Sequence, residues 1–143
     1  MARWFNSLAA VPVIVLALIA VGGCAPGRDE LEGTQWRLAA WTLSSLSPGE
    51  FNITAEFADG QVGGHGGVNS YGGPYTLGPG NAFVVGSIVS TEMAGPEPAM
   101  RAEGAYLTLL GQARSYRVEA DRLTLFDAGG NEALIFEAAG IRP

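Results

Sequence analysis

The chain has 143 residues, which fits one domain, and its 21 glycines among turn-forming and β-branched residues are typical of an all-β or α+β fold. Its 14 acidic residues outnumber 8 basic residues, all of them arginine. This balance argues against DNA or RNA binding, which needs a basic face, and leaves no polybasic patch for anionic lipid.

Residues 1–23 have the features of a lipoprotein signal peptide. Arg3 supplies a positive charge, and residues 8–21 form an apolar run that is short for a membrane span of about 20 residues. Small residues then precede the only cysteine, Cys24, as in a bacterial lipobox. A lone cysteine is usually a buried core residue, but a core cannot form directly after an apolar leader. We therefore expect cleavage before Cys24 and its lipidation.

Lipidation at Cys24 would anchor the protein in the cell envelope, with its domain outside the cytoplasm. Ala25, rather than Asp, follows the cysteine, which favours the outer membrane if the source is Gram-negative. We assign residues 24–32 to a tether and residues 33–138 to the folded domain.

The first strands follow from alternation of apolar and polar residues. Residues 34–42 predict a strand whose inner face carries Trp36, and we read this tryptophan as a core anchor, with ligand stacking as the alternative. After a loop, residues 52–57 predict a second strand. Asp59-Gly60 then predicts a two-residue hairpin turn, because both positions tolerate positive φ.

The glycine-rich stretch over residues 62–77 is the centre of the prediction. Several glycines close together indicate a bend or close backbone approach, so we expect a strongly coiled strand at the corner of a barrel-like sheet. A loose loop is the alternative, but apolar residues recur through the stretch. Asn69 is predicted to lie in a bend and to bond to backbone, with a contact role as the alternative.

The second half predicts one helix and more strands. A turn at residues 78–81 leads to a strand over residues 82–91, which is apolar on both faces and so expected to be buried on both. The helix is predicted at about 98–112. We place Met100, Leu107 and Leu110 on its inner stripe, widened by Ala99, Ala102, Tyr106 and Leu109. The later strands are predicted at 114–119, 122–126 and 133–137.

Several segments in order resemble motifs of the META domain family, which includes the HslJ-like heat-shock lipoproteins. The longest is GGHGGVNSYGGPYTL, and GTQWRL, STEMA, MRAE and LTL resemble the family's opening, pre-helix, helix and late-hairpin segments. The resemblance covers about residues 31–136. Many members carry cysteine where this chain has Val68 and Gly95, so a bridge or metal role for that pair cannot apply here. The residues that match family motifs are Gly33, Thr34, Trp36, Gly64, Gly67, Asn69, Tyr71, Gly73, Tyr75, Thr91, Met93 and Glu103.

The resemblance implies an α+β, mainly antiparallel fold, in which a strongly curved barrel-like sheet of about seven or eight strands packs against one helix at about 98–112. It also implies a non-enzymatic envelope protein that binds or helps to fold another protein and is linked to stress, drug tolerance or secretion. Glu103 matches the family's helix acid, which either bonds inside the protein or is solvated.

Nothing in the sequence indicates chemistry. His65 is the only histidine and has no nearby acid in sequence, so we predict no catalytic residue, no metal site and no cofactor. An envelope hydrolase would need a nucleophile beside a base. The remaining alternative is a carrier of a small apolar ligand or lipid, or a pilotin-like secretion accessory lipoprotein. For that alternative we expect a cavity lined by Tyr71, Tyr75, Phe83 and Leu107.

Overall fold

The computed structural model describes residues 29–42 and 45–140, so the predicted signal peptide and Cys24 lie outside the described part. The segments are β1 (Thr34–Trp41), β2 (Thr54–Ala58), β3 (Gln61–His65), β4 (Ser70–Gly78), β5 (Ala82–Val85), β6 (Val89–Ser90), α1 (Glu97–Gln112), β7 (Ser115–Glu119), β8 (Arg122–Phe126) and β9 (Glu132–Ala138), with short 3-10 helices at Pro48–Glu50 and Pro79–Asn81.

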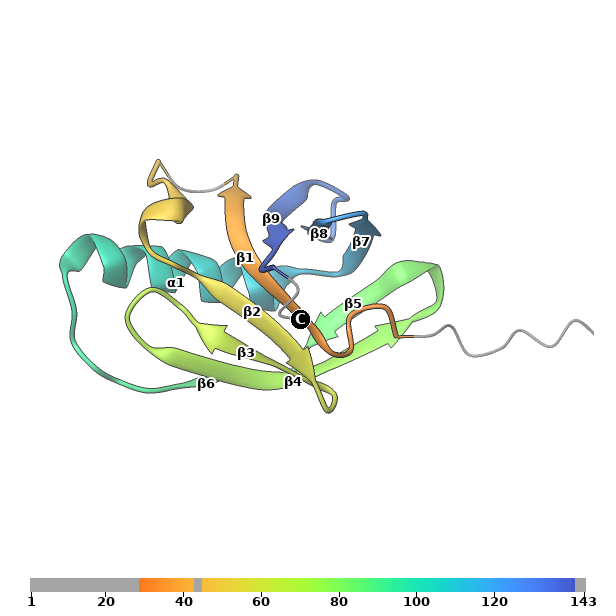
Figure 1. Cartoon of the computed structure of the whole chain (residues 1–143), viewed down its shortest axis with the longest axis horizontal. Coiled ribbons are helices and arrows are strands. Elements are labelled where there is room, and N and C mark those ends of the chain that lie inside the picture. Colours follow the sequence, from red (N-terminus) through yellow and green to blue (C-terminus); the bar gives the residue numbers. More distant parts are fainter. Residues whose placement is uncertain (1–28, 43–44, 141–143) are drawn as a thin grey trace, which may run out of the picture.

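Eight strands form a closed antiparallel barrel, as the sequence predicts (Figure 1). They follow the order β3-β2-β1-β9-β8-β7-β5-β4, and β3 pairs with β4 to complete the ring. The ring is weakest between β5 and β7, where Ala82 pairs with Ser115 and Phe83 N–H donates to Arg114 O at 2.9 Å. The short strand β6 pairs with Tyr71 and Gly72 of β4, on the same side of β4 as β5 and opposite β3.

Alternating side chains of the barrel strands fill its interior. Trp36 and Leu38 of β1 and Ala55 and Phe57 of β2 are buried, and Asp59 and Gly60 form the β2–β3 hairpin turn with φ of 54° and 72°. The inward residues that are at most 4% exposed are Trp36, Leu38, Ile53, Ala55, Phe57, Val62, Phe83, Leu123, Leu125, Leu134 and Phe136.

Helix α1 packs against the barrel, but its buried face differs from the prediction. Met100 is 38% exposed, whereas Glu103 is only 6% exposed. Tyr106 is fully buried, and its ring meets those of Tyr71 and Phe136 edge-on, with centroids 5.3 Å and 6.3 Å away. The buried helix residues are Ala99, Ala102, Glu103, Tyr106, Leu109 and Leu110. The buried face of α1 differs from the predicted one because it includes the acid Glu103, and a prediction from apolar residues alone leaves acids out.

The glycine-rich stretch forms a hairpin of two strands, β3 and β4, rather than one coiled strand. The bend between them covers residues 66–69, where Gly66 N–H donates to Asn69 O at 2.8 Å. Both strands pair with neighbours along their length, so the loose-loop alternative is wrong. This bend is the corner of the sheet that was predicted from the glycines of the stretch.

The strand predicted at 82–91 is split into β5 and β6, and its outer face is not buried. Val85 pairs with Tyr75 and Val89 with Gly72, so the β5–β6 side has one more residue than β4. This is a bulge, and it lies opposite Pro74, which has no N–H to donate to a ladder.

Residues 29–32, assigned to the tether from the sequence, belong to the folded domain. Leu31 is fully buried in the core. Glu32 accepts hydrogen bonds from the backbone N–H groups of Asp59 and Gly60 at 2.5 Å and 3.4 Å. The domain therefore begins closer to Cys24 than the sequence indicated.

Candidate functional site

The bend at residues 66–69 is held by the carboxylate of Glu103 from helix α1. Oε2 accepts the backbone N–H of Val68 at 2.9 Å and of Asn69 at 2.6 Å. Oε1 accepts the Asn69 side-chain amide at 2.8 Å. Both residues are buried, so an acid and an amide that are 34 positions apart in sequence share one buried site. Of the two alternatives for Glu103, the structure shows the internal one.

Asn69 also holds the segment between β6 and α1. Its Oδ1 accepts Thr91 Oγ1–H at 2.9 Å and Met93 N–H at 2.7 Å, while its Nδ2 donates to Met93 O at 3.2 Å. Thr91 Oγ1 in turn accepts Ser70 N–H at 3.2 Å. Asn69, Thr91 and Glu103, three of the residues that match family motifs, thus form one network that joins the hairpin, the pre-helix segment and the helix.

Two glycines let the bend approach the helix closely. A Cβ on Gly66 would lie 3.0 Å from both Cγ and Oε2 of Glu103. Gly67 has φ of +127°, which disfavours other residues, and its Cβ would lie 3.2 Å from Ala99 O. The glycines therefore provide the space in which the carboxylate meets the bend.

The network favours the charged form of Glu103. Burial raises the pKa of this carboxyl, but the hydrogen bonds from Asn69 and Val68, with His65 nearby, lower the pKa below its ordinary value of 4.5. His65 lies at the end of β3, and its Nδ1 accepts Gly67 N–H at 3.3 Å. A carboxylate fully engaged in hydrogen bonds is suited to holding structure rather than to proton transfer.

Other motif residues support the barrel. A Cβ on Gly64 would lie 2.5 Å from Thr54 O, and a Cβ on Gly73 would lie 2.8 Å from Ser87 O. Tyr71 Oη donates to Thr54 O at 2.8 Å. These positions are explained by close backbone packing and by pairing of a buried hydroxyl group.

Tyr75 binds two acids at the start of the domain, a contact that the sequence analysis missed. Its hydroxyl lies 2.6 Å from Asp29 Oδ2 and 3.0 Å from Glu32 Oε2. Burial and then these carboxylates raise the pKa of Tyr75, so the hydroxyl stays protonated. Asp29 also caps its own turn by accepting the N–H groups of Leu31 and Glu32, a local pattern that the sequence could have revealed.

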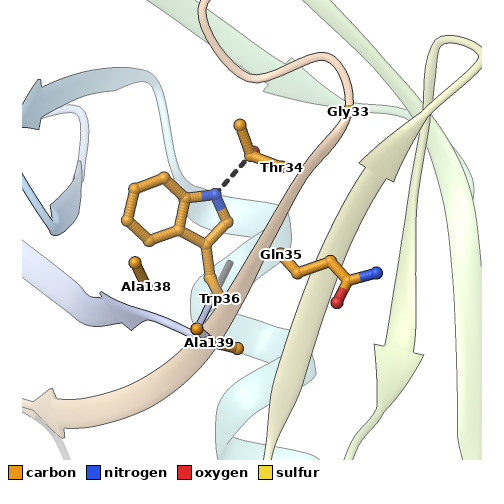
Figure 2. A pocket seen from close by; sticks show the side chains of 7 residues that line it. Gly33, Thr34, Gln35, Trp36, Ala138 and Ala139 are labelled. Atoms are coloured by element: carbon orange, nitrogen blue, oxygen red, sulfur yellow. Dashed lines mark hydrogen bonds between the residues drawn. The ribbon is translucent and has the colours of Figure 1, made fainter. Parts of the chain in front are cut away.

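An open depression of about 380 Å³ lies beside Trp36, Thr34 and the end of β9 (Figure 2). Trp36 is 4% exposed, and its indole N–H donates to Thr34 Oγ1 at 2.7 Å. The indole is therefore a core residue with its polar atom satisfied, as expected. The lining residues are all uncharged: Gly33, Thr34, Gln35, Trp36, Ala138, Ala139 and Gly140.

The aromatic residues expected to line a ligand cavity pack against one another. Tyr75 and Phe83 stack with ring centroids 6.2 Å apart, and Phe57 meets Tyr75 edge-on at 5.1 Å. The hydroxyl groups of Tyr71 and Tyr106 form a hydrogen bond of 2.5 Å. Side chains therefore occupy this part of the barrel interior.

The large apolar side chains that are exposed in the described residues come from one stretch of chain. Val84 is 46% exposed, Val89 is 72%, Met93 is 60% and Met100 is 38%. We refer to these four residues as the 84–100 surface. Met93 was noted from the sequence as a family-motif residue, whereas burial was predicted for Val84, Val89 and Met100.

Two findings on the described residues concern membrane crossing and metal binding. No helix there combines the length and apolar character that crossing a bilayer requires. No group of three or more His, Cys, Asp or Glu residues within 29–42 and 45–140 is placed to hold a metal ion.

Comparisons with known proteins agree with this geometry. The chain resembles the NMR structure of a protein from Burkholderia xenovorans at 23% identity and a TM-score of 0.65, over 99% of this chain and 100% of that one. A DUF4847 family protein from Bacteroides vulgatus is similar at 11% identity and a TM-score of 0.55, over 76% and 94%. At these identities the likeness shows the fold alone.

A second NMR structure is similar at 16% identity and a TM-score of 0.60, over 76% of this chain and 92% of that one. Comparison with curated protein sequences gives no match. The profile of the META domain matches residues 29–140, which is most of the chain and includes the whole barrel. The chain therefore belongs to the META domain family.

Proposed function

We propose that this protein is a lipid-anchored, non-enzymatic protein-binding domain of the bacterial cell envelope. The small-residue motif before Cys24 supports the anchor, and the 84–100 surface supports the binding role. A role in envelope stress, drug tolerance or secretion accords with the HslJ-like resemblance.

The observation that carries the binding role is the concentration of exposed apolar residues. Val89 and Met93 are the most exposed of the large apolar residues in the described part, and they lie four positions apart. Exposed large apolar side chains within one short segment of chain are a common feature of interaction sites. Elsewhere, the large apolar side chains of the described domain are buried or half-buried.

The polar motif residues favour a structural role over a catalytic one. Asn69 uses both side-chain atoms in hydrogen bonds to Glu103, Thr91 and Met93. In the described residues, every buried side-chain nitrogen or oxygen has a hydrogen-bond partner. The network therefore directs its hydrogen-bonding groups inward, where they hold the backbone of Met93, one residue of the 84–100 surface.

The anchor is tested by metabolic labelling with palmitate. The wild-type chain should incorporate label, and the Cys24→Ala variant should not. Ala25→Ser, which leaves the thiol in place, is the matched control and should still be labelled. Labelling of Cys24→Ala would contradict the anchor.

The binding role is tested by photocrosslinking in the native envelope. A photoreactive amino acid at Val89 or Met93 should give a discrete protein adduct, whereas the same probe at Ala128, in the exposed β8–β9 turn, should not. Adducts should weaken when Val84→Asp is added. Equal adducts from all three positions, or none, would contradict a binding site at this surface.

A further inference from the structure

We infer that the free edge of β6 binds an extended protein segment by strand addition, and that this segment carries both apolar and basic side chains. The inference rests on the proposed function, because it specifies how the 84–100 surface would bind a protein and which chemistry its partner has.

The backbone of β6 has an open side. In the described sheet β6 pairs with β4 only, and Val89 and Ser90 are exposed, so the side of β6 away from β4 has no strand neighbour. Thr91 N–H donates to Ser70 O on β4 at 3.0 Å. Because residues of an antiparallel strand alternate in the direction of their backbone groups, the N–H and C=O of Ser90 point to the open side. An added strand could pair there.

The face beside this edge is apolar and nearly flat. Val89 lies opposite Gly72, which lies opposite Gly63, which lies opposite Glu56, so these four residues form a row across the sheet. Val89 and Glu56 are exposed at the two ends of this row, and the two glycines between them have no side chain. A side chain next to Val89 on an added strand would therefore meet an apolar residue without obstruction from β4.

The charge around this surface selects the partner. Glu56, Glu92 and Glu97 are exposed near it, and Arg101 is already paired with Glu97 at 3.9 Å. The described residues carry all fourteen acidic residues of the chain but five of its eight arginines. A second copy of the domain or an anionic membrane would be repelled, whereas a basic segment would be attracted.

The test uses the full-length protein in nanodiscs of zwitterionic lipid and three synthetic peptides. The first has the sequence Arg-Val-Thr-Val-Arg-Val-Thr-Val, the second replaces each Arg by Glu, and the third is the first with its backbone N-methylated on one edge. NMR hydrogen exchange at the Ser90 amide reports strand addition directly, and titration gives the Kd.

The basic peptide should bind and slow exchange of the Ser90 amide at least tenfold. The glutamate peptide should bind at least tenfold more weakly at low salt, and the N-methylated peptide should not protect Ser90. Val89→Ser, which removes the apolar side chain without adding charge, should weaken binding at least tenfold, whereas Ala128→Ser, in the β8–β9 turn, should weaken it far less.

Equal binding of the basic and acidic peptides, or an unprotected Ser90 amide at saturation, would overturn the inference. Sedimentation that shows self-association through β6, which the basic peptide cannot disrupt, would also overturn it by making a second copy the occupant. If crosslinks from Val89 and Met93 persist while Ser90 stays unprotected, the surface binds protein by another mode and the proposed function stands. If Val89 and Met93 also give no crosslinks, both the strand-addition inference and the proposed binding function are wrong.

Discussion

Gly95 lies directly against Val68. A Cβ at position 95 would lie 3.4 Å from the Val68 Cβ and 2.7 Å and 2.8 Å from its two methyl carbons. The valine therefore fills the space that a side chain at 95 would need, and it joins the bend to the segment that precedes the helix. These are the two positions at which the resemblance to the family implies cysteines, and the structure brings them into contact.

Replacing both residues by cysteine should create a disulfide. The 3.4 Å separation is close to the Cβ–Cβ range of about 3.5–4.5 Å found in disulfides. In a Cys24→Ser background, Val68→Cys with Gly95→Cys should raise the free energy of unfolding by about 3 kcal/mol when oxidised. Thiol titration and denaturant unfolding, with and without reductant, measure this. Two free thiols after oxidation would contradict the geometry.

Removing the charge of Glu103 should destabilise the domain. Glu103→Gln places an amide donor opposite the donors of Asn69 and Val68, so we expect a loss of about 2 kcal/mol in the free energy of unfolding. Glu97→Gln, on the same helix but exposed, is the matched control and should change it by less than about 0.5 kcal/mol. Urea unfolding of the two variants would refute the network's role if the two losses were equal.

The same carboxylate should make stability fall in acid. The folded-state pKa of Glu103 is below 4.5, so its contribution is complete above pH 4.5 and is lost as the pH falls through the folded-state value. The stability difference between wild type and Glu103→Gln should therefore be constant near neutral pH and shrink below pH 4.5. Lowered pKa values of Asp127 and Glu32 act in the same direction but cancel in this difference. A difference that grows in acid would contradict the assignment.

Two glycines should respond to alanine in opposite directions. Gly73→Ala would bring Cβ to 2.8 Å from Ser87 O, which costs about 1–3 kcal/mol because backbone must move. Gly104 lies in α1 with nothing within 4 Å of its Cβ position, so Gly104→Ala should stabilise by about 0.5–1 kcal/mol. Thermal unfolding of both variants measures this, and the same sign for both would show that packing at Gly73 is looser than described.

Local patterns in the sequence were sufficient for much of the barrel. Alternation placed the inner faces of β1 and β2, and Asp59-Gly60 located the hairpin turn between β2 and β3, because each depends on adjacent residues. The split between β5 and β6 was not predictable in this way. It lies opposite Pro74 on β4, which has no backbone N–H. The alternating residues of 82–91 do not reveal that a residue on a neighbouring strand lacks this donor.

The polar network was missed for the same physical reason. Asn69 and Glu103 were singled out separately, but nothing in the sequence indicates that the helix returns to the bend 34 positions later. The contact of Tyr75 with Asp29 spans 46 residues and is likewise set by barrel closure. The periodicity of a helix sequence shows which face is apolar. A buried acid such as Glu103 is recognised only when the N–H groups that donate to its carboxylate are located in the structure.

The hydrogen bond of Tyr75 to Asp29 would limit the distance between the domain and a bilayer that holds acyl chains on Cys24. If Cys24 carries acyl chains, five peptide steps separate it from Asp29, a reach of at most about 18 Å. The entry to β1 and the β6–α1 connection lie at opposite ends of the long axis (Figure 1). Such a short tether would keep the β1 end of the barrel near the lipid. Val89 and Met93 would then face away from the membrane, where proteins that do not touch the membrane could reach them.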